Sequence, residues 1–419
     1  MEELSIIDPH GTQLPPIDGG KDAWLFLAAC FVMEALIWGF SFAFGIFQDY
    51  YSTHPPFAGS SNIAVIGTCA MGVTYLLEPL TFGVLLTYPR LRRWACPVGF
   101  VIMCLALALS SFSTTTTHLM LSQGVFYGLG ANIAYTPTII FMDEWFVRKK
   151  GLAFGIMWAG TGLSGVILPI VFQWLLNDYG YQTTLRVWAL TLLIMAGPLL
   201  YFIKPRIPIS SSLHPRPLNW TFLKQRSFAI YQLGNTLEAM GYFLPTIYLP
   251  SYARTLGAST LYASLTAILF NVGTVIGCVI MGTFVDRYHA TTCILISTIG
   301  STIAVFVLWG VSLSLAPLYV FCIAYGLFAG SFTSTWPAIF MAVRRQNPFA
   351  DAGMVFGFLC AGRGIGNVVS GPLSEALMKT DWRGIGGAYA GSYGSLVLFT
   401  GISALLGGVS VIGRPLRWV

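Results

Sequence analysis

Four ionisable side chains interrupt long apolar stretches of this 419-residue chain: Glu34, Glu78, Glu238 and Arg363. An ionised group inside hydrocarbon costs about 2.5–3.5 kcal/mol on membrane-insertion scales, so a function is the first hypothesis for each. A guanidinium can bind a carboxylate through two hydrogen bonds, and a partly desolvated glutamic acid can carry a proton. We therefore predict substrate binding at Arg363 and proton coupling at Glu238 or Glu34. The alternative is a purely structural ion pair that joins the two halves of the chain, and a structural role is favoured for Glu78.

The composition indicates which solvent surrounds these side chains. The chain is 55% hydrophobic and 9% charged, whereas soluble proteins carry about 25% charged residues. We therefore expect an integral membrane protein with most of its length in the lipid bilayer. The net charge of +6 comes from loops between apolar segments, so it does not indicate a nucleic-acid partner.

A helix needs about 20 mostly apolar residues to cross a bilayer, and twelve segments of the chain qualify. These segments are 24–47, 62–86, 95–112, 118–141, 151–176, 183–203, 228–252, 261–284, 290–313, 318–343, 352–378 and 385–413. The proline-rich polar stretch 204–226 follows the sixth segment. The predicted fold is all-α, with twelve transmembrane helices in two pseudo-symmetric six-helix bundles, 23–203 and 227–413, joined by this linker and flanked by tails 1–22 and 414–419.

An internal repeat supports the two halves. Residues 155–164 read GIMWAGTGLS and residues 357–366 read GFLCAGRGIG, with a constant offset of 202 residues. Glu34 and Glu238, each followed by Ala, recur at a similar offset of 204. A membrane chain that repeats at half its length is typical of a transporter whose site lies where the halves meet.

Basic residues predict the orientation in the membrane. Seventeen of the 22 Lys and Arg lie in the tails, the linker and the loops that follow even-numbered segments, and four lie in the remaining loops. Because cytoplasmic loops are enriched in Lys and Arg, both termini are predicted to be cytoplasmic. The plasma membrane is the expected location, with an internal organelle as the alternative.

One loop carries a motif of a known superfamily. Residues 282–287 read GTFVDR, which resembles the G-x-x-x-D-R loop of the major facilitator superfamily. The resemblance implies that Asp286 closes one face by pairing with a cation or a helix N-terminus of the other half. Gate residues are therefore expected at Asp286, at Arg287 and at Arg148 in the basic loop before the fifth segment. The matching loop of the first half has Thr87 in place of the Asp.

A second resemblance is more specific. Residues 145–162, WFVRKKGLAFGIMWAGTG, resemble the signature that enters the fifth helix of monocarboxylate transporters, and residues 18–24, DGGKDAW, resemble that family's entry to the first helix. The chain is similar to fungal members, which have short central linkers. Two departures from the animal members matter. Their first-helix Lys has no counterpart in 24–47, and their eighth-helix Asp and Arg are four residues apart, whereas Arg287 directly follows Asp286. The binding chemistry of the animal members is therefore not carried over whole.

The remaining candidates are polar or aromatic side chains inside predicted helices, for which packing is the alternative to substrate binding. They are Asn132, Tyr325, Trp336 and Asn367. The sequence GTGLSG at 160–165 matches the dinucleotide pattern G-x-G-x-x-G, but it lies within a predicted span, where small residues let helices approach closely.

The predicted function is proton-coupled transport of a small organic carboxylate by alternating access. Export of a larger secondary metabolite is the alternative within transport, and a membrane sensor that binds without moving solute is the alternative of another class. No metalloprotease, nucleophile-elbow or Walker motif is present, so neither an enzyme nor an ATP-driven pump is expected. The predicted partners are a small organic anion, a proton and lipid; no cofactor or metal is expected, and no accessory membrane protein can be named.

Overall fold

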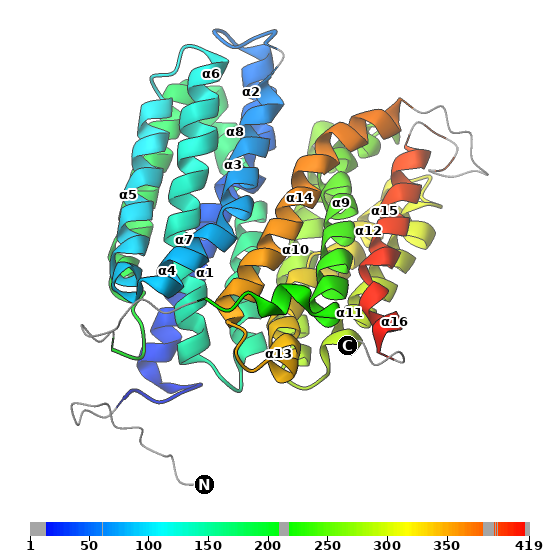
Figure 1. Cartoon of the computed structure of the whole chain (residues 1–419). Helices are drawn as coiled ribbons and strands as arrows, with labels where there is room; N and C mark the ends of the chain where they lie inside the picture. The colour runs from blue at the N-terminus through cyan, green and yellow to red at the C-terminus, as the bar shows by residue number, and fades with distance from the viewer. Residues whose placement is uncertain are drawn as a thin grey trace.

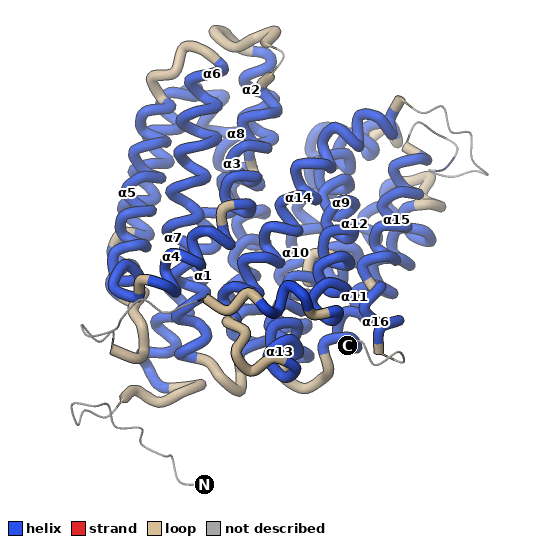
Figure 2. Tube along the Cα trace, in the orientation of Figure 1, coloured by secondary structure: helices blue, strands red, loops and turns tan. Residues whose placement is uncertain are grey.

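The computed structural model describes residues 14–60, 62–208, 218–379, 389, 391 and 393–414. These residues form helices, turns and loops, without strands (Figures 1 and 2). Figure 1 shows two bundles side by side, one built from the first half of the chain and the other from the second. The predicted all-α fold class with two six-helix halves is confirmed.

The N-terminal bundle contains six crossings. Its helices are α1 (Gly20–Phe42), α2 (Phe44–Thr53), α3 (Ile63–Leu76), α4 (Glu78–Thr87), η1 (Pro89–Leu91), α5 (Arg92–Ser110), α6 (Thr116–Leu119), η2 (Met120–Phe126), α7 (Tyr127–Trp145), α8 (Lys150–Ala196) and η3 (Pro198–Tyr201). The first crossing continues to Thr53, beyond the predicted end at residue 47. The second is broken at Leu77, because Pro79 lacks an N–H and disfavours a continuous helix around it.

The longest helix, α8, accounts for two predicted crossings. The span 150–201 has 52 residues, and a straight helix of that length would be about 78 Å long, more than twice the hydrocarbon thickness of about 30 Å. The chain reverses at Gly180, whose φ of 74° and ψ of 173° are not helical. Glycine adopts this left-handed φ without a steric penalty, so the fifth and sixth crossings follow each other almost without a loop.

The C-terminal bundle repeats this organisation. Its helices are η4 (Thr221–Lys224), α9 (Arg226–Thr255), α10 (Thr260–Val285), α11 (Ala290–Ile303), η5 (Ala304–Trp309), α12 (Leu315–Phe328), η6 (Phe332–Thr335), α13 (Trp336–Gln346), α14 (Ala352–Met378), α15 (Gly394–Gly407) and α16 (Val409–Gly413). Part of the predicted last span, 385–413, falls outside the described residues. The described part of that crossing begins at Gly394.

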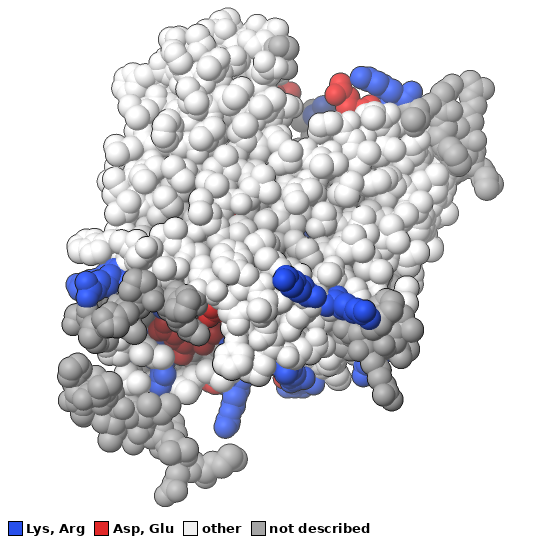
Figure 3. All heavy atoms as spheres, viewed as in Figure 1, with Lys and Arg blue, Asp and Glu red and all other residues white. Residues whose placement is uncertain are grey.

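Ten helical segments of the described chain are long and apolar enough to cross a membrane by length and composition. One of these ten segments contains both arms of α8 and so counts as two crossings. Helix α9 is not among the ten: its 30 residues are long enough, but it is more polar. Counting the second arm of α8 and α9, the described chain has twelve crossings. On the face shown in Figure 3, Lys, Arg, Asp and Glu lie toward the two ends, and a broad middle band has none, as expected for a surface in contact with lipid.

The two bundles are in contact mainly near one end of the molecule. We call the end where α1 begins and α16 ends the terminal face, and the opposite end the far face. Figure 1 shows the bundles converging toward the terminal face and diverging toward the far face. The most extensive contacts between them are made by α8 against α10 and by α3 and α4 against α14.

Candidate functional site

Arg363 and Glu238 form an ion pair deep in the C-terminal bundle. Nη1 of Arg363, at the middle of α14, donates a hydrogen bond to Oε2 of Glu238 on α9 at 2.8 Å. The two residues are 2% and 5% exposed. Both belong to the same half, so this pair does not join the two halves. Oε1 of Glu238 has no hydrogen-bond partner among the described residues, which leaves the carboxyl free to accept another hydrogen bond or a proton.

Two aromatic rings of α9 lie against the guanidinium of Arg363. It lies 4.4 Å from the ring centroid of Tyr242 and 5.5 Å from that of Phe243, which is within cation–π range. Phe243 stacks on Phe42 of the other half, with 6.4 Å between ring centroids. These rings exclude water from the ion pair and provide a flat apolar surface beside a cation.

The N-terminal half contains the same arrangement without the cation. Thr161 holds the position that is repeat-equivalent to Arg363, and its hydroxyl donates to Oε1 of Glu34 at 2.7 Å. One helical turn after each glutamate stands an aromatic residue, Trp38 or Tyr242, again 204 residues apart. Oε2 of Glu34 and Nε1 of Trp38 are buried without a partner among the described residues. The internal repeat is thus visible in the structure as two glutamates in equivalent positions. Glu238 pairs with the positive charge of Arg363, whereas Glu34 pairs with a neutral hydroxyl.

Unpartnered polar atoms and apolar rings therefore meet near the boundary of the two halves. Trp38 packs against Tyr75 at 4.5 Å between ring centroids, and α3 at Tyr75 meets α14 at Gly364, next to Arg363. Ligand sites typically combine apolar walls with a few convergent polar groups. The chemistry of this arrangement suits a carboxylate at Arg363 and an apolar ring beside it, and substrate binding there stays a prediction.

A layer of aromatic rings lies between this site and the terminal face. Trp158 of α8 meets Trp336 at 5.9 Å and Phe356 at 6.2 Å, and Trp336 meets Phe356 at 5.3 Å. Nε1 of Trp336 donates to Oδ1 of Asn235 at 3.1 Å, which fixes the ring. We call Trp158, Trp336 and Phe356 the aromatic plug. Because its rings come from both halves, the plug must separate before a solute can pass.

The other predicted substrate-binding residues lie in different surroundings. Asn132 is fully buried in the N-terminal half, where it donates to the carbonyl of Thr74 at 2.9 Å and accepts from Thr81. Tyr325 packs against Phe321 and Phe270 within the C-terminal half.

Asn367 lies across the boundary, with Nδ2 at 3.3 Å from Sδ of Met71. The structure therefore places Asn367 and Trp336 at the contact between halves. It places Asn132 and Tyr325 inside one half each, and substrate binding by any of the four stays a prediction.

The predicted gate residue Asp286 bridges the two halves at the terminal face. Its carboxylate accepts hydrogen bonds from the backbone N–H groups of Gly151 at 2.6 Å and Leu152 at 2.9 Å. These N–H groups lie in the first turn of α8, where the helix dipole favours an anion. Partial burial raises the pKa of Asp286, and the hydrogen bonds from Leu152 and Gly151 act in the opposite direction.

Glycine is required where α8 crosses α10 beside this contact. A Cβ atom on Gly151 would clash with the carbonyl of Gly282, and one on Gly282 would clash with the carbonyl of Gly151. The glycine of the G-x-x-x-D-R motif therefore brings the two helices close enough for Asp286 to reach the α8 terminus. Arg287, next along the chain, is exposed.

Arg148 is also exposed, and its backbone takes part in a second contact at the start of α8. The carboxylate of Asp18 accepts from the N–H groups of Val147, Arg148 and Lys149 at 2.8–3.0 Å. The two segments that resemble monocarboxylate transporters thus lie against each other. Sequence reasoning identified both segments but not this contact between them, because residues about 130 positions apart leave no local pattern.

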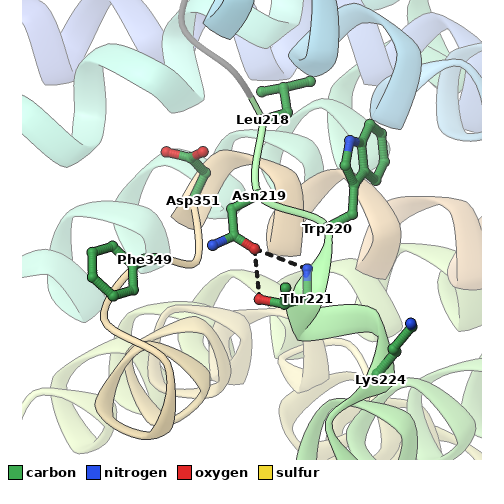
Figure 4. Close-up of a pocket in the computed structure, with 7 residues that line it drawn as sticks. All are labelled: Leu218, Asn219, Trp220, Thr221, Lys224, Phe349 and Asp351. Atoms are coloured by element: carbon green, nitrogen blue, oxygen red, sulfur yellow. Dashed lines mark hydrogen bonds between the residues drawn. The ribbon is translucent and has the colours of Figure 1, made fainter.

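An open hollow at the terminal face involves the linker. Figure 4 shows it between the linker residues Asn219 and Trp220 and the segment that precedes α14, which contributes Phe349 and Asp351. Its volume is about 580 Å³. None of the central residues lines it, so it is separate from the candidate site. Within the described residues, no group of three or more His, Cys, Asp or Glu is placed to hold a metal ion.

Comparison with known proteins identifies the family. The family model of the Major Facilitator Superfamily matches residues 25–342 and 233–411, so the chain belongs to this superfamily of membrane transporters. It is a transport protein and not an enzyme, as predicted.

Individual relatives agree with this assignment. The chain is 27% identical to MFS transporter asaE of Aspergillus flavus, over 95% of this chain and 87% of the relative. It is 28% identical to the agnestins efflux protein AgnL12 of Paecilomyces divaricatus, over 97% and 90%. It is 29% identical to monocarboxylate transporter 13 of Bos taurus, over 90% and 86%. The resemblance to monocarboxylate transporters is confirmed.

Proposed function

We propose that this transporter exports a small organic acid that carries an apolar ring, and that the acid leaves together with a proton by alternating access. The observation that carries the proposal is the buried Arg363–Glu238 pair beneath the rings of Tyr242 and Phe243. A relative that is named the agnestins efflux protein favours export, the alternative prediction, over transport of a small monocarboxylate. We propose a carboxylate on the exported compound because Arg363 is the cation of the candidate site.

Charge balance explains why a proton accompanies the acid. In the structure the positive charge of Arg363 is matched by Glu238. A carboxylate substrate that displaces Glu238 would leave that carboxylate without a cation in a buried position, which is costly. If Glu238 takes a proton as the substrate binds, the site stays neutral at every step. Acid and proton then move together, and the combined gradients of the acid and of the proton set the direction of transport.

The contacts at the terminal face support alternating access. The aromatic plug and the Asp286 contact hold the halves together on that side, while the bundles diverge on the other side (Figure 1). We infer from the distribution of basic residues that the terminal face is cytoplasmic. The structure then corresponds to the outward-facing state, and export requires the terminal face to open.

Transport in proteoliposomes tests the proposal. Three labelled solutes are compared: an aromatic carboxylic acid, the matched neutral amide and a short aliphatic acid. We expect transport of the aromatic acid, stimulation by a pH gradient and no dependence on membrane potential, because the transported pair is neutral. Equal transport of the amide, or transport driven by potential and not by pH, would contradict the proposal. Preference for the short aliphatic acid would show that the substrate carries no apolar ring, and it would leave the proposed coupling to a proton in place.

A further inference from the structure

Glu78 is a buried carboxylic acid that the proposed transport cycle does not use. It is the first residue of α4, directly after the break between α3 and α4, and it is 0% exposed. Oε2 accepts a hydrogen bond from Thr136 at 3.0 Å, and Oε1 has no partner among the described residues. The same Thr136 hydroxyl also lies 2.8 Å from the carbonyl of Asn132, and its single proton cannot serve both acceptors.

No cation among the described residues compensates this carboxyl. The titratable groups that face it are Tyr135 on α7, Cys360 on α14 and Glu34 on α1, and none of them supplies a positive charge. No Lys or Arg forms an ion pair with Glu78 in the part of the chain that the structure describes. An ionised carboxylate without a cation or sufficient donors is disfavoured in such surroundings, so this closed arrangement suits the protonated acid.

The position of Glu78 connects its protonation to the contact between the halves. Pro79 lies against α14, where a Cβ atom built on Gly357 would be 3.1 Å from its Cα. One turn after Glu78, Phe82 packs on Phe356 of the aromatic plug, with 5.7 Å between ring centroids. The segment Glu78–Phe82 therefore forms the N-terminal side of the α4–α14 contact at the terminal face.

This contact is the counterpart of the one made by Asp286. In the C-terminal half a carboxylate of the loop after α10 binds the start of α8. In the N-terminal half the corresponding loop has Thr87, and the start of α14 at Gly353 is covered by the ring of Phe82. One side of the terminal face is thus closed by a charged contact, and the other by an apolar contact with a buried acid behind it.

The geometry points to Glu78 as a second proton-binding site, which holds a proton while the terminal face is closed and releases it when α4 separates from α14. The inference rests on the proposed function for its alternating-access cycle. Its sign follows from linkage: a group that binds its proton more tightly in the closed state favours closure at low pH, and this contribution is lost as the pH rises. The proton enters and leaves on the same side, so Glu78 controls opening and adds no second transported proton.

The test measures the conformation without any solute. Spin labels are attached through Tyr88→Cys and Phe349→Cys, two exposed positions on different halves of the terminal face, in the full chain in lipid nanodiscs. We expect the short distance to dominate at acidic pH and a longer distance to grow at alkaline pH. For one proton the ratio of the two populations changes by at most about tenfold per pH unit.

Variants assign the effect to one carboxyl. Glu78→Gln should keep the short distance at all pH values, whereas Glu375→Gln, an exposed carboxyl on α14, should behave as the parent. Thr136→Val removes the donor to Oε2, which disfavours the ionised form, so the transition should move to higher pH. If Glu78→Gln does not fold, the shift in the pH response of Thr136→Val still tests the inference.

A pH response of Glu78→Gln equal to that of the parent would overturn the inference, and so would a parent whose distances do not change with pH. Because no solute is present, these results do not depend on the substrate. Loss of the proposed transport with a retained pH response would refute the function and leave the Glu78 site standing.

Discussion

Nη1 of Arg363 lies 2.8 Å from Oε2 of Glu238, and Thr161 occupies the repeat-equivalent position of Arg363, with its hydroxyl 2.7 Å from Glu34. The two halves therefore keep the same pair of positions with different chemistry. The C-terminal pair is charged, and we propose that a carboxylate substrate displaces Glu238 from Arg363. The N-terminal pair has a neutral Thr161 hydroxyl in place of the cation, so the proposed anion site lies in the C-terminal half.

Substitution of Arg363 tests anion binding. Arg363→Lys keeps the charge but loses the planar fork that binds a carboxylate through two hydrogen bonds. Because a hydrogen bond to a charged group contributes about 1.5–3 kcal/mol, we expect about tenfold weaker substrate binding in Arg363→Lys and a larger loss in Arg363→Gln. Direct binding of the acid to purified protein, with membrane level and thermal stability as controls, provides the measurement. Wild-type affinity in both variants would leave Arg363 with a structural role alone.

Substitution of Asp286 tests closure of the terminal face. Asp286→Ala removes the acceptor for two backbone N–H groups of α8, so the closed state should lose stability and opening should become more frequent. Labelling of Leu86→Cys, which faces Gly353 across the boundary, by an impermeant maleimide reports the opening. We expect labelling to rise several-fold in Asp286→Ala. The control Arg287→Ala, which alters an exposed side chain, should leave the labelling unchanged. Equal labelling of the Leu86→Cys parent, Asp286→Ala and Arg287→Ala would show that the Asp286 contact does not hold the terminal face closed.

Substitution of Asp18 tests the contact between the two motif segments. Asp18→Ala leaves three N–H groups at the start of α8 without their acceptor, and loss of such a cap typically costs about 1 kcal/mol. We expect a lower melting temperature, because the contact lies within the N-terminal half and supports the start of α8. Asp22→Ala, an exposed acid in the first turn of α1, is the matched control. A melting temperature equal to that of Asp22→Ala would show that the contact adds no stability.

Tags at the two chain ends test the inferred orientation. The excess of Lys and Arg on one side predicts that both ends face the cytoplasm. Antibodies added to intact cells should therefore not reach either tag, and permeabilisation should expose both. A tag accessible on intact cells would reverse the orientation, and the structure would then represent the inward-facing state.

Sequence patterns predicted the helices because length and apolar composition determine them, and matching residues about 200 positions apart predicted the repeat. The apolar spans indicated the crossings, and the matched Glu34 and Glu238 survive in space as equivalent positions. The G-x-x-x-D-R motif also predicted its contact, since Asp286 binds a helix N-terminus of the other half.

The direction in which each side chain points could not be predicted in the same way. In a soluble helix the polar face marks the outside, but in lipid both faces of a helix are apolar. The sequence therefore did not reveal that Trp158, Trp336 and Phe356 form one layer. It also did not reveal that Asn132 is bonded within its own half or that Glu78 lies behind an apolar contact.

The most direct test of the central claim is the proton movement that accompanies the acid. Proteoliposomes with a trapped pH indicator receive the aromatic acid, and labelled-acid exchange is measured in parallel for wild type, Glu238→Gln and Glu34→Gln. The account predicts internal acidification together with uptake in wild type and in Glu34→Gln. In Glu238→Gln, exchange should persist without proton movement, because Gln keeps the shape of the side chain but cannot titrate. Unchanged proton movement in Glu238→Gln would contradict the account, and its loss in Glu34→Gln alone would transfer the coupling to the N-terminal half.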